Sequence, residues 1–427
     1  MNESLFIQFI SKVFSKLGTL IEKINGKRNA NLTYLHKTML RKEYSADQKW
    51  ESASVNTNYV TADVVSMDSA LPIKKRDSIA RANGKLPKIG LKYQLSESQI
   101  NEINVMIAQG ATMEQIAKKL INDSVKCSTA IDERNEANFL SGFSNGVCLI
   151  EDENNAGVGL RVNFGYLAAN SFGVEEVNHI SRESIERVIE KADADGNAPR
   201  YMWIALSTYK KLRQETWAKE LVANFRGQVY TNPDNLPTPT ATAFNEAFAD
   251  EFGGIVIITI DRVCISEKNG VRITYKPWNA NKVIFTPSEE VGALVWGTLA
   301  EMTNPVEGVL YSIVDEYKLI SKFSKTDPLA EYTAGQAMVL PVIEGVDQIY
   351  SLDISEAQSL DSDAEGIDTS DENITVWGET YAKSAFVAAL AKLGIKASAT
   401  SSDATLIKKV NSLSNEDEAR LRELLSK

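Results

Sequence analysis

A chain of 427 residues is long enough for two or three domains, and its 43% hydrophobic and 24% charged residues are typical of globular proteins, which argues against wholesale disorder. The net charge of −11 disfavours a dedicated nucleic-acid binder, because binding phosphates requires clustered lysine and arginine. With only two histidines and three widely spaced cysteines, the sequence offers little for zinc binding, histidine-dependent catalysis or a disulfide framework.

The N-terminal segment, residues 1–56, is predicted to be an arm that begins with an amphipathic helix. Apolar side chains follow helical spacing up to Ile24, whereas Glu3, Lys12 and Lys16 make a signal peptide a poor interpretation. We expect the helix to dock on protein, with a membrane-surface helix as the alternative. No apolar run approaches the roughly 20 residues that span a bilayer, so the sequence predicts a soluble protein.

Residues 57–95 combine β-forming side chains with a basic stretch and predict an extended β-hairpin loop with little core of its own. Asn83-Gly84 is a strong two-residue turn signal, and Pro72 and Pro87 flank it. Between residues 71 and 92 there are seven basic residues and one acidic residue. The candidate contact residues of this stretch are Lys74, Lys75, Arg76, Asp77, Arg81, Lys85, Lys88 and Lys92.

Three interpretations of this basic stretch are open. It is a nucleic-acid site, a solvated hairpin, or an arm that meets acidic surface on neighbouring copies of the chain. The first is weakened by the acidic chain and by the lack of a cluster of stacking aromatic residues in this part of the sequence. The third fits the excess of 57 acidic over 46 basic residues, which makes acidic surface plentiful.

Residues 96–171 are predicted to begin with a long helical segment. Ser96 and Gln99 form a capping-box pattern, and isoleucines at helical spacing follow. The helical signal breaks at Gly110, restarts and continues to about Phe143. Strict alternation of apolar residues then predicts a strand over 158–164.

Residues 172–305 mix helices and strands without regular alternation. Helices are predicted near residues 185–192 and 244–252, strands at 201–206 and 255–260, and a hairpin at 263–275 with its tip at Asn269-Gly270. A single long strand is predicted from Val309 to Phe323. This irregular order disfavours a doubly wound parallel sheet and favours the α+β class.

The C-terminal part is predicted to be a separate unit. Residues 353–372 have the composition of a solvated acidic linker, with seven acidic residues and no basic one between Glu356 and Glu372. Residues 373–427 then carry three short apolar faces with capping signals, the first of them beginning at Tyr381. We therefore expect a small helical module.

Motifs that carry catalysis are missing from the sequence. There is no GxxxxGK[ST] loop and no HExxH. Gly157-x-Gly159 lacks the rest of a dinucleotide fingerprint, and Asp193 and Asp195 lack the later acidic ligand of a calcium loop, so a strand-entry turn and a helix end are the expected structures. We expect no catalytic residue, no metal and no cofactor, and hence not an enzyme.

The stretch from Asp68 to Lys88 resembles a segment of the major capsid proteins of tailed bacteriophages, which share the Hong Kong 97 phage capsid fold. The resemblance rests on Asp68, Leu71-Pro72, Lys74, Arg76-Asp77 and the run ANGKLPK at 82–88. Looser similarities follow in the family's order at 162–170, 275–287 and 337–343.

This resemblance implies an extended loop at 57–95, a peripheral domain with a spine helix at 96–171, an axial domain at 172–305 and return strands at 306–352. The linker (353–372) and the C-terminal module (373–427) lie outside it. The implied function is self-assembly, through hexamers and pentamers, into the icosahedral head that encloses double-stranded DNA. The implied partners are copies of the chain and scaffolding, portal and decoration proteins, with weak non-specific DNA contact and no membrane.

The resemblance also places the protein in the virion after synthesis in the host bacterial cytoplasm. It makes the intersubunit interpretation of the basic stretch the favoured one. Two alternatives from other classes are a cytoplasmic α+β enzyme with an unrecognised carboxylate site and a phage accessory protein that binds DNA or a partner.

Overall fold

The computed structural model divides the chain into two units, Met1–Ala357 and Gln358–Lys427. In the first unit it describes residues 34–54, 80–110, 113–151, 159–228, 236–268, 271–327 and 329–357. In the second it describes 358, 373–376, 379–382, 386, 389–390 and 420–422. The predicted N-terminal amphipathic helix lies outside the described residues.

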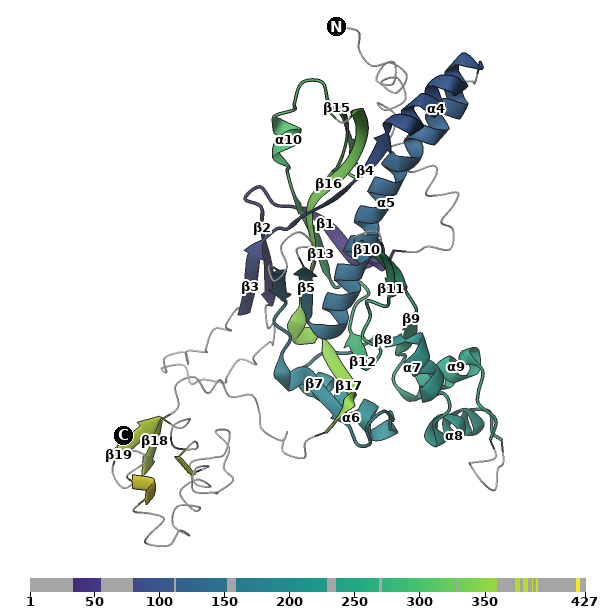
Figure 1. Ribbon diagram of the computed structural model, residues 1–427. Coiled ribbons are helices and arrows are strands. Elements are labelled where there is room, and N and C mark those ends of the chain that lie inside the picture. Colours follow the sequence, from purple (N-terminus) through teal and green to yellow (C-terminus); the bar gives the residue numbers. More distant parts are fainter. Residues whose placement is uncertain are drawn as a thin grey trace, which may run out of the picture. The chain divides into compact units, whose positions relative to one another are not determined.

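A sheet built around one long strand forms the upper part of the first unit in Figure 1. The central strand β16 (Leu329–Ile343) pairs with β15 (Lys318–Thr326), with β13 (Gly292–Gly297) and with β4 (Lys88–Ser96), all antiparallel. At the edges, β14 (Leu310–Val314) pairs with β15, and β1 (Leu40–Tyr44) runs parallel to β13. The helix α5 (Met113–Asn145) packs along β16.

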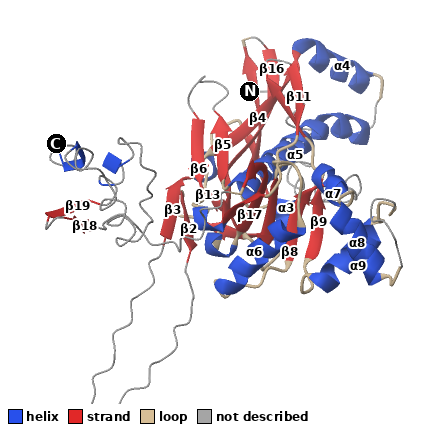
Figure 2. Ribbon diagram, turned by 90° about the horizontal axis from the view of Figure 1, so that it is seen from below, coloured by secondary structure: helices blue, strands red, loops and turns tan. Residues whose placement is uncertain are grey.

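A second sheet has the strand order β7-β17-β12-β8-β9. Its strands are β7 (Ser171–Val174), β17 (Tyr350–Ala357), β12 (Lys282–Thr286), β8 (Tyr201–Ala205) and β9 (Val256–Ile260). Because successive side chains point to opposite faces, Met202 and Ile204 join a core with four helices, whereas Trp203 faces the core of α5. The helices are α6 (Arg182–Ala194), α7 (Leu206–Leu212), α8 (Thr216–Phe225) and α9 (Ala241–Glu251). In Figure 1, α6 lies below this sheet and the other three lie to its right, and Figure 2 shows them from below.

Shorter elements connect these layers. Three antiparallel ribbons are formed by β2 (Lys49–Ser54) with β3 (Ala80–Lys85), β5 (Val147–Glu151) with β6 (Gly159–Asn163), and β10 (Cys264–Lys268) with β11 (Val271–Tyr275). The remaining helices described in the first unit are α3 (Leu35–Met39), α4 (Glu97–Ala108) and α10 (Ala300–Thr303), with 3-10 turns at Ala168–Asn170 and Val346–Gln348.

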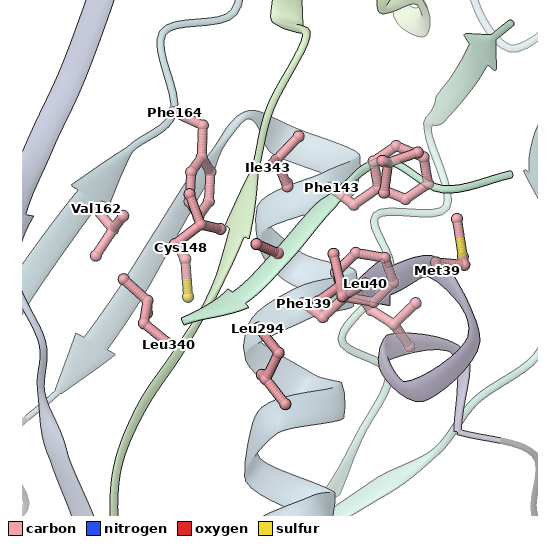
Figure 3. Close-up of a cluster of buried hydrophobic side chains, with 14 of the residues drawn as sticks. Met39, Leu40, Phe139, Phe143, Cys148, Val162, Phe164, Leu294, Leu340 and Ile343 are labelled. Carbon is pink, nitrogen blue, oxygen red and sulfur yellow. The ribbon is translucent and has the colours of Figure 1, made fainter. Parts of the chain in front are cut away.

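The main core lies where α5 meets the first sheet. Figure 3 shows Phe139 and Phe143 of α5 on the same side of this core as Met39, with Leu340 on the other side near Cys148. The two phenylalanine rings stack with centroids 5.5 Å apart. These side chains are almost completely buried, so the hydrophobic effect holds α5 and the sheet together as one body.

The α+β class is confirmed, as are most of the predicted elements between residues 96 and 275. The Ser96 amide donates to Gln99 Oε1 at 3.0 Å, so the predicted capping pattern is present at the start of α4. The turn at Gln109-Gly110 separates α4 from α5, as predicted, and Asp195 ends α6 as a helix cap. The strands of the 263–275 hairpin are also present, while its tip, Asn269-Gly270, lies outside the described residues.

The predicted turn at Asn83-Gly84 is wrong. Both residues lie inside β3, where Gly84 pairs with Trp50 of β2. A Cβ at Gly84 would lie 2.8 Å from the Trp50 Nε1 atom, so glycine is present because the indole ring needs the space. The break between β3 and β4 lies instead at Leu86-Pro87.

The N-terminal arm and the extended loop were both predicted to be too long. Met39, Leu40 and Trp50 are buried, and β1 is a strand of the main sheet, so the chain belongs to the core from Tyr34 onward. At the other end of the loop, β4 pairs with β16 over nine residue pairs and Ile89 is a core residue. The polar composition of these two segments gave no sign of their buried contacts, because the strands with which they pair are distant in sequence.

The predicted acidic linker begins too early. Asp353 is buried in β17 and forms an ion pair with Lys282 at 2.7 Å, so the strand extends to Ala357. The C-terminal unit is also not helical throughout. Its residues Asn373–Val376 and Glu379–Ala382 form an antiparallel pair of strands, β18 and β19, for which the alternating β-branched residues Ile374 and Val376 are suited.

Residues of the second unit that follow these strands carry helical structure at Phe386, at Ala389-Leu390 and at 420–422. Phe386, Leu390 and Leu421 are fully buried, so this unit has apolar core residues of its own. In the described part of the chain, no helix is both long and apolar enough to cross a membrane.

The long strand predicted from Val309 to Phe323 is two strands, β14 and β15, joined by a tight turn. Asp315 and Glu316 adopt positive φ angles of 52° and 74° in this turn. The turn was missed because Asp-Glu is not one of the Asn-Gly or Asp-Gly pairs that favour this conformation. The left-handed backbone is unfavourable for a side chain such as that of Glu316.

We therefore predict that Glu316→Gly stabilises the subunit. Glycine relieves the left-handed strain, and a gain of about 0.5–1 kcal/mol is expected after its greater freedom in the unfolded chain is counted. The Glu316–Lys42 contact at 3.7 Å is exposed on both sides and contributes little. Urea unfolding measures the change, with Glu289→Gly as the control, since Glu289 is exposed and has negative φ. If Glu316→Gly loses as much stability as the control variant, the backbone at Glu316 is not strained and the prediction is wrong.

Candidate functional site

The candidate contact residues of the basic stretch divide into two groups. Lys74, Lys75, Arg76 and Asp77 lie outside the described residues, and for Arg81 only the backbone in β3 is described. Lys85, Lys88 and Lys92 are exposed. Lys88 and Lys92 are four residues apart on β4. Because side chains alternate between the two faces of a strand, both point to the same face of the main sheet.

This face of the sheet carries more than the two lysines. The strand register places Lys92 opposite Ala334 and brings Tyr332 and Phe323 next to each other. The Lys92 ammonium lies 5.3 Å from the Tyr332 ring centroid, and that ring stacks on Phe323 at 5.3 Å. The exposed Lys325 lies two residues beyond Phe323 on the same strand. We call Lys88, Lys92, Phe323, Lys325 and Tyr332 the basic sheet face.

The sequence had predicted only part of the basic sheet face. Lys88 and Lys92 were candidates, whereas Phe323, Lys325 and Tyr332 were missed. They join the face only through the pairing of β4, β15 and β16, which links distant parts of the chain. In the structure Tyr332, Gln336 and Met338 of β16 are half-buried on this face, but the residue types along 330–338 do not alternate and gave no local signal for it.

The opposite face of the same sheet is closed by α5. Gly335 of β16 lies against this helix, because a Cβ there would be 2.7 Å from the Cys127 Cβ. The Cys127 thiol points to the Thr333 carbonyl oxygen at 3.6 Å. One face of the sheet is therefore packed against α5 inside the subunit. The basic sheet face is the opposite face, which points toward solvent.

The position of α5 is fixed by two buried carboxylates. Glu136 accepts hydrogen bonds from the backbone amides of Leu35 and His36, each at 3.0 Å, and its Oε2 lies 2.6 Å from His36 Nδ1. The first amides of a helix lack acceptors within the helix. The Glu136 carboxylate is the acceptor for the first amides of α3. The His36 ring lies between Glu136 and Asp132, whose Oδ1 is 4.0 Å from Nε2.

Asp132 is completely buried and contacts two cations. Lys318 Nζ lies 2.7 Å from its Oδ1 as a close ion pair, and Lys37 donates to its Oδ2 at 2.9 Å. Lys318, itself buried, also contacts Asp315 at 2.6 Å. Burial raises the pKa of Asp315, but the charge and hydrogen bond of Lys318 and the charge of Lys37 outweigh it, so the pKa is lowered overall.

A third α5 carboxylate, Glu133, accepts a hydrogen bond from Tyr34 at 2.9 Å and one from Arg262. Burial and the Glu133 charge both raise the Tyr34 pKa, so its hydroxyl stays protonated as the donor. We call Asp132, Glu133, Glu136, His36 and Lys318 the α5 charge network. Acidic residues at 132, 133 and 136 beside apolar Ile131 and Phe139 are the sequence signal that could have indicated this network.

The described residues provide no catalytic thiol. Burial raises the pKa of Cys127 and of Cys148 to about 12 and that of Cys264 to about 11. The thiolate is the reactive form, so these cysteines stay protonated near neutral pH. Of the two histidines, His36 is enclosed in the α5 charge network, and His179 contacts Glu215 at 3.0 Å on the surface. Within the same residues, no group of three His, Cys, Asp or Glu side chains is arranged to hold a metal ion.

Comparison with known proteins gives one family. A family model described as phage major capsid protein E matches residues 16–344. A search of curated protein sequences finds no match.

Several solved structures are similar to the chain. One is described as a capsid protein of an Escherichia coli prophage, with 12% identity, a TM-score of 0.46 and coverage of 79% of this chain and 98% of that one. Another is the capsid asymmetric unit of cyanophage A-1(L), with 12% identity, a TM-score of 0.44 and coverage of 77% and 95%. A third is a phage-related protein from Bordetella bronchiseptica, with 9% identity, a TM-score of 0.38 and coverage of 79% and 96%.

The α5 charge network predicts a large effect of removing Lys318. In Lys318→Ala the buried Asp132 loses one of its two cations, and losing a partner of a buried ion pair costs about 3–5 kcal/mol. Urea unfolding of the unassembled subunit measures the loss. Lys42→Ala is the control, because its contact with Glu316 is exposed and a change below about 1 kcal/mol is expected. Equal, small losses in both variants would show that the network does not hold α5.

Proposed function

The chain belongs to the phage major capsid protein E family, and from this we propose that its basic residues join each copy to its neighbours in the head shell. The protein is a phage major capsid protein, a structural protein that is no enzyme, and it forms the shell of the virion with copies of itself. The observation that carries this function is the family match over residues 16–344. It replaces the enzyme and the accessory binding protein that the sequence had left as alternatives.

The proposed contact surface has two parts. One is the basic arm, which we define as Lys74, Lys75, Arg76, Arg81 and Lys85, together with Asp77. The other is the basic sheet face. Electrostatic complementarity supports both parts, because a chain with 57 acidic and 46 basic residues presents acidic surface to its neighbours.

The base of the arm is held firmly on the subunit. β2 and β3 pair over six residue pairs, and the Trp50 ring lies over Gly84 and 6.0 Å from the Phe164 ring. Trp50 is buried and belongs to the main core. A rigid base supports an intersubunit role, because it limits the freedom that the arm loses when it binds.

The proposal extends to the other components of the head. We propose closed icosahedral shells, built from hexamers and pentamers, that enclose double-stranded DNA and are made in the host cytoplasm with scaffolding, portal and decoration proteins as partners. The net charge of −11 supports weak, non-specific contact with the packaged DNA, because tight binding needs many cations facing phosphate.

The basic sheet face gives a direct test. Changing Lys88, Lys92 and Lys325 to Glu should leave the subunit folded, because the three side chains are exposed and such substitutions change stability by only about 0.5 kcal/mol. The yield of closed shells should fall at least about tenfold, because like charges across an interface cost several kcal/mol. Sedimentation and electron microscopy of particles measure the yield, and urea unfolding checks the fold.

The matched control keeps the charge. A variant with Lys88, Lys92 and Lys325 changed to Arg should assemble as the unchanged chain does, because arginine also retains the contact with the Tyr332 ring. A parallel variant with Lys74, Lys75 and Arg76 changed to Glu tests the arm. Normal shells from both Glu variants would show that these residues are solvated surface.

The second unit, residues 358–427, is proposed to be an appendage of the shell subunit. It follows β17, begins with an acidic stretch and has its own buried residues, Phe386, Leu390 and Leu421. The family match ends at residue 344, before this unit begins. A unit with its own core tethered by a polar segment rarely supplies core to its neighbour. Its proposed role is to decorate the shell or to recruit another virion component.

Truncation after Gln358 should therefore still permit assembly. The cut must follow Ala357, because an earlier cut at Asp353 would remove part of β17 and the Asp353–Lys282 ion pair. Heating truncated and full-length particles side by side compares their stability, and equal transition temperatures are expected. Failure of the truncated chain to assemble, or shells that melt much earlier, would mean that the second unit clamps neighbouring subunits.

A further inference from the structure

The ribbon of β10 and β11 exposes apolar side chains that the subunit itself leaves uncovered. Ile265, Val271 and Ile273 are 64%, 62% and 54% exposed, and Val263 just before the ribbon is also exposed. The base of the ribbon is anchored by the buried Cys264 and the half-buried Tyr275. Four large apolar residues exposed within eleven positions of one hairpin differ from the singly scattered residues that are normal on a surface.

Both faces of the ribbon carry this apolar surface. Ile273 lies opposite Ser266 and Val271 opposite Lys268, on the face that Cys264 and Tyr275 share, whereas Ile265 lies on the other face opposite Thr274. In the described part of the chain, β10 and β11 pair only with each other, so each strand keeps an open edge. Two-stranded ribbons are marginally stable in water by themselves. An apolar ribbon of this kind is suited to lie against another molecule.

The charges of the ribbon favour an apolar protein partner. Arg272 donates to Glu267 across the ribbon at 2.8 Å, so these two charges already compensate each other. A nucleic-acid contact would need several cations directed at phosphate, and the ribbon does not offer them. The exposed isoleucines and valines match the apolar centre of a protein interface instead.

We propose that this ribbon is an interface between copies of the chain, with Ile265, Val271 and Ile273 as its anchors. The occupant is a second copy, because a shell built of copies surrounds each subunit with others. The inference rests on the shell function and adds a contact that is independent of the basic residues. The ribbon supplies apolar burial, which salt does not screen, where the basic arm and the basic sheet face supply charge.

The test changes the two isoleucines without touching a charge contact. In Ile265→Asp with Ile273→Asp, the subunit should keep its circular dichroism and its urea midpoint, because both side chains are exposed. The yield of shells should fall at least tenfold. The control is Val177→Asp with Val306→Asp, two exposed apolar residues in loops, and these chains should assemble normally. Normal assembly of the isoleucine variant would overturn the proposal.

A second variant covers the case in which aspartate unfolds the ribbon. Ile265→Thr with Ile273→Thr keeps β-branched side chains, which strands favour, and removes part of the apolar surface. It should fold and give a smaller but clear loss of shells. If this variant also fails to fold, the isoleucines serve the subunit's own stability and the proposal is wrong. If the unchanged chain forms no shells, the shell function itself is contradicted.

Discussion

Burial of carboxylates on α5 is the constraint on which the other contacts depend. Asp132 and Glu136 have no access to water, so each needs a cation or donor from elsewhere in the chain. Lys37 and the α3 amides meet this need from the N-terminal side, and Lys318 meets it from the start of β15. Distant segments are therefore fixed to one helix by electrostatics as well as by apolar packing.

The two faces of the main sheet, built around β16, have different roles in the subunit. The side chains that face α5 are internal, and Gly335 allows the helix to lie directly against β16. The side chains that face away include Lys92 and Tyr332, which form a charged and aromatic surface. Because α5 fixes the sheet, the position of that surface is set by the buried network on the other side. The ribbon β10–β11 also starts from this region, since Arg262, two residues before Cys264, binds Glu133.

Local signals were sufficient for much of the fold and for little of the surface. Capping residues and helical spacing predicted α4, α5 and α6, alternation predicted β6, and a continuous apolar run predicted β8. Asn83-Gly84 was wrongly predicted to be a turn. An Asn-Gly pair is typical of turns, but here the glycine is required because the Trp50 ring occupies the space of a Cβ. The long partnership of β4 with β16, and with it the basic sheet face, depends on residues far apart in sequence. No local pattern specifies such a pairing, because its energy comes from burial in the finished fold.

The pairing of β4 with β16 also sets an order of events during synthesis. Residues 88–96 are made early, but their strand partner, residues 329–343, is made only when most of the chain has been translated. Until then α5 lacks both the strand that covers its apolar side and Lys318, the cation for Asp132. Non-local pairings of this kind form slowly, since a long loop must close first. A nascent subunit therefore completes its sheet only after residue 343 has been made, which delays the appearance of an ordered surface for its neighbours.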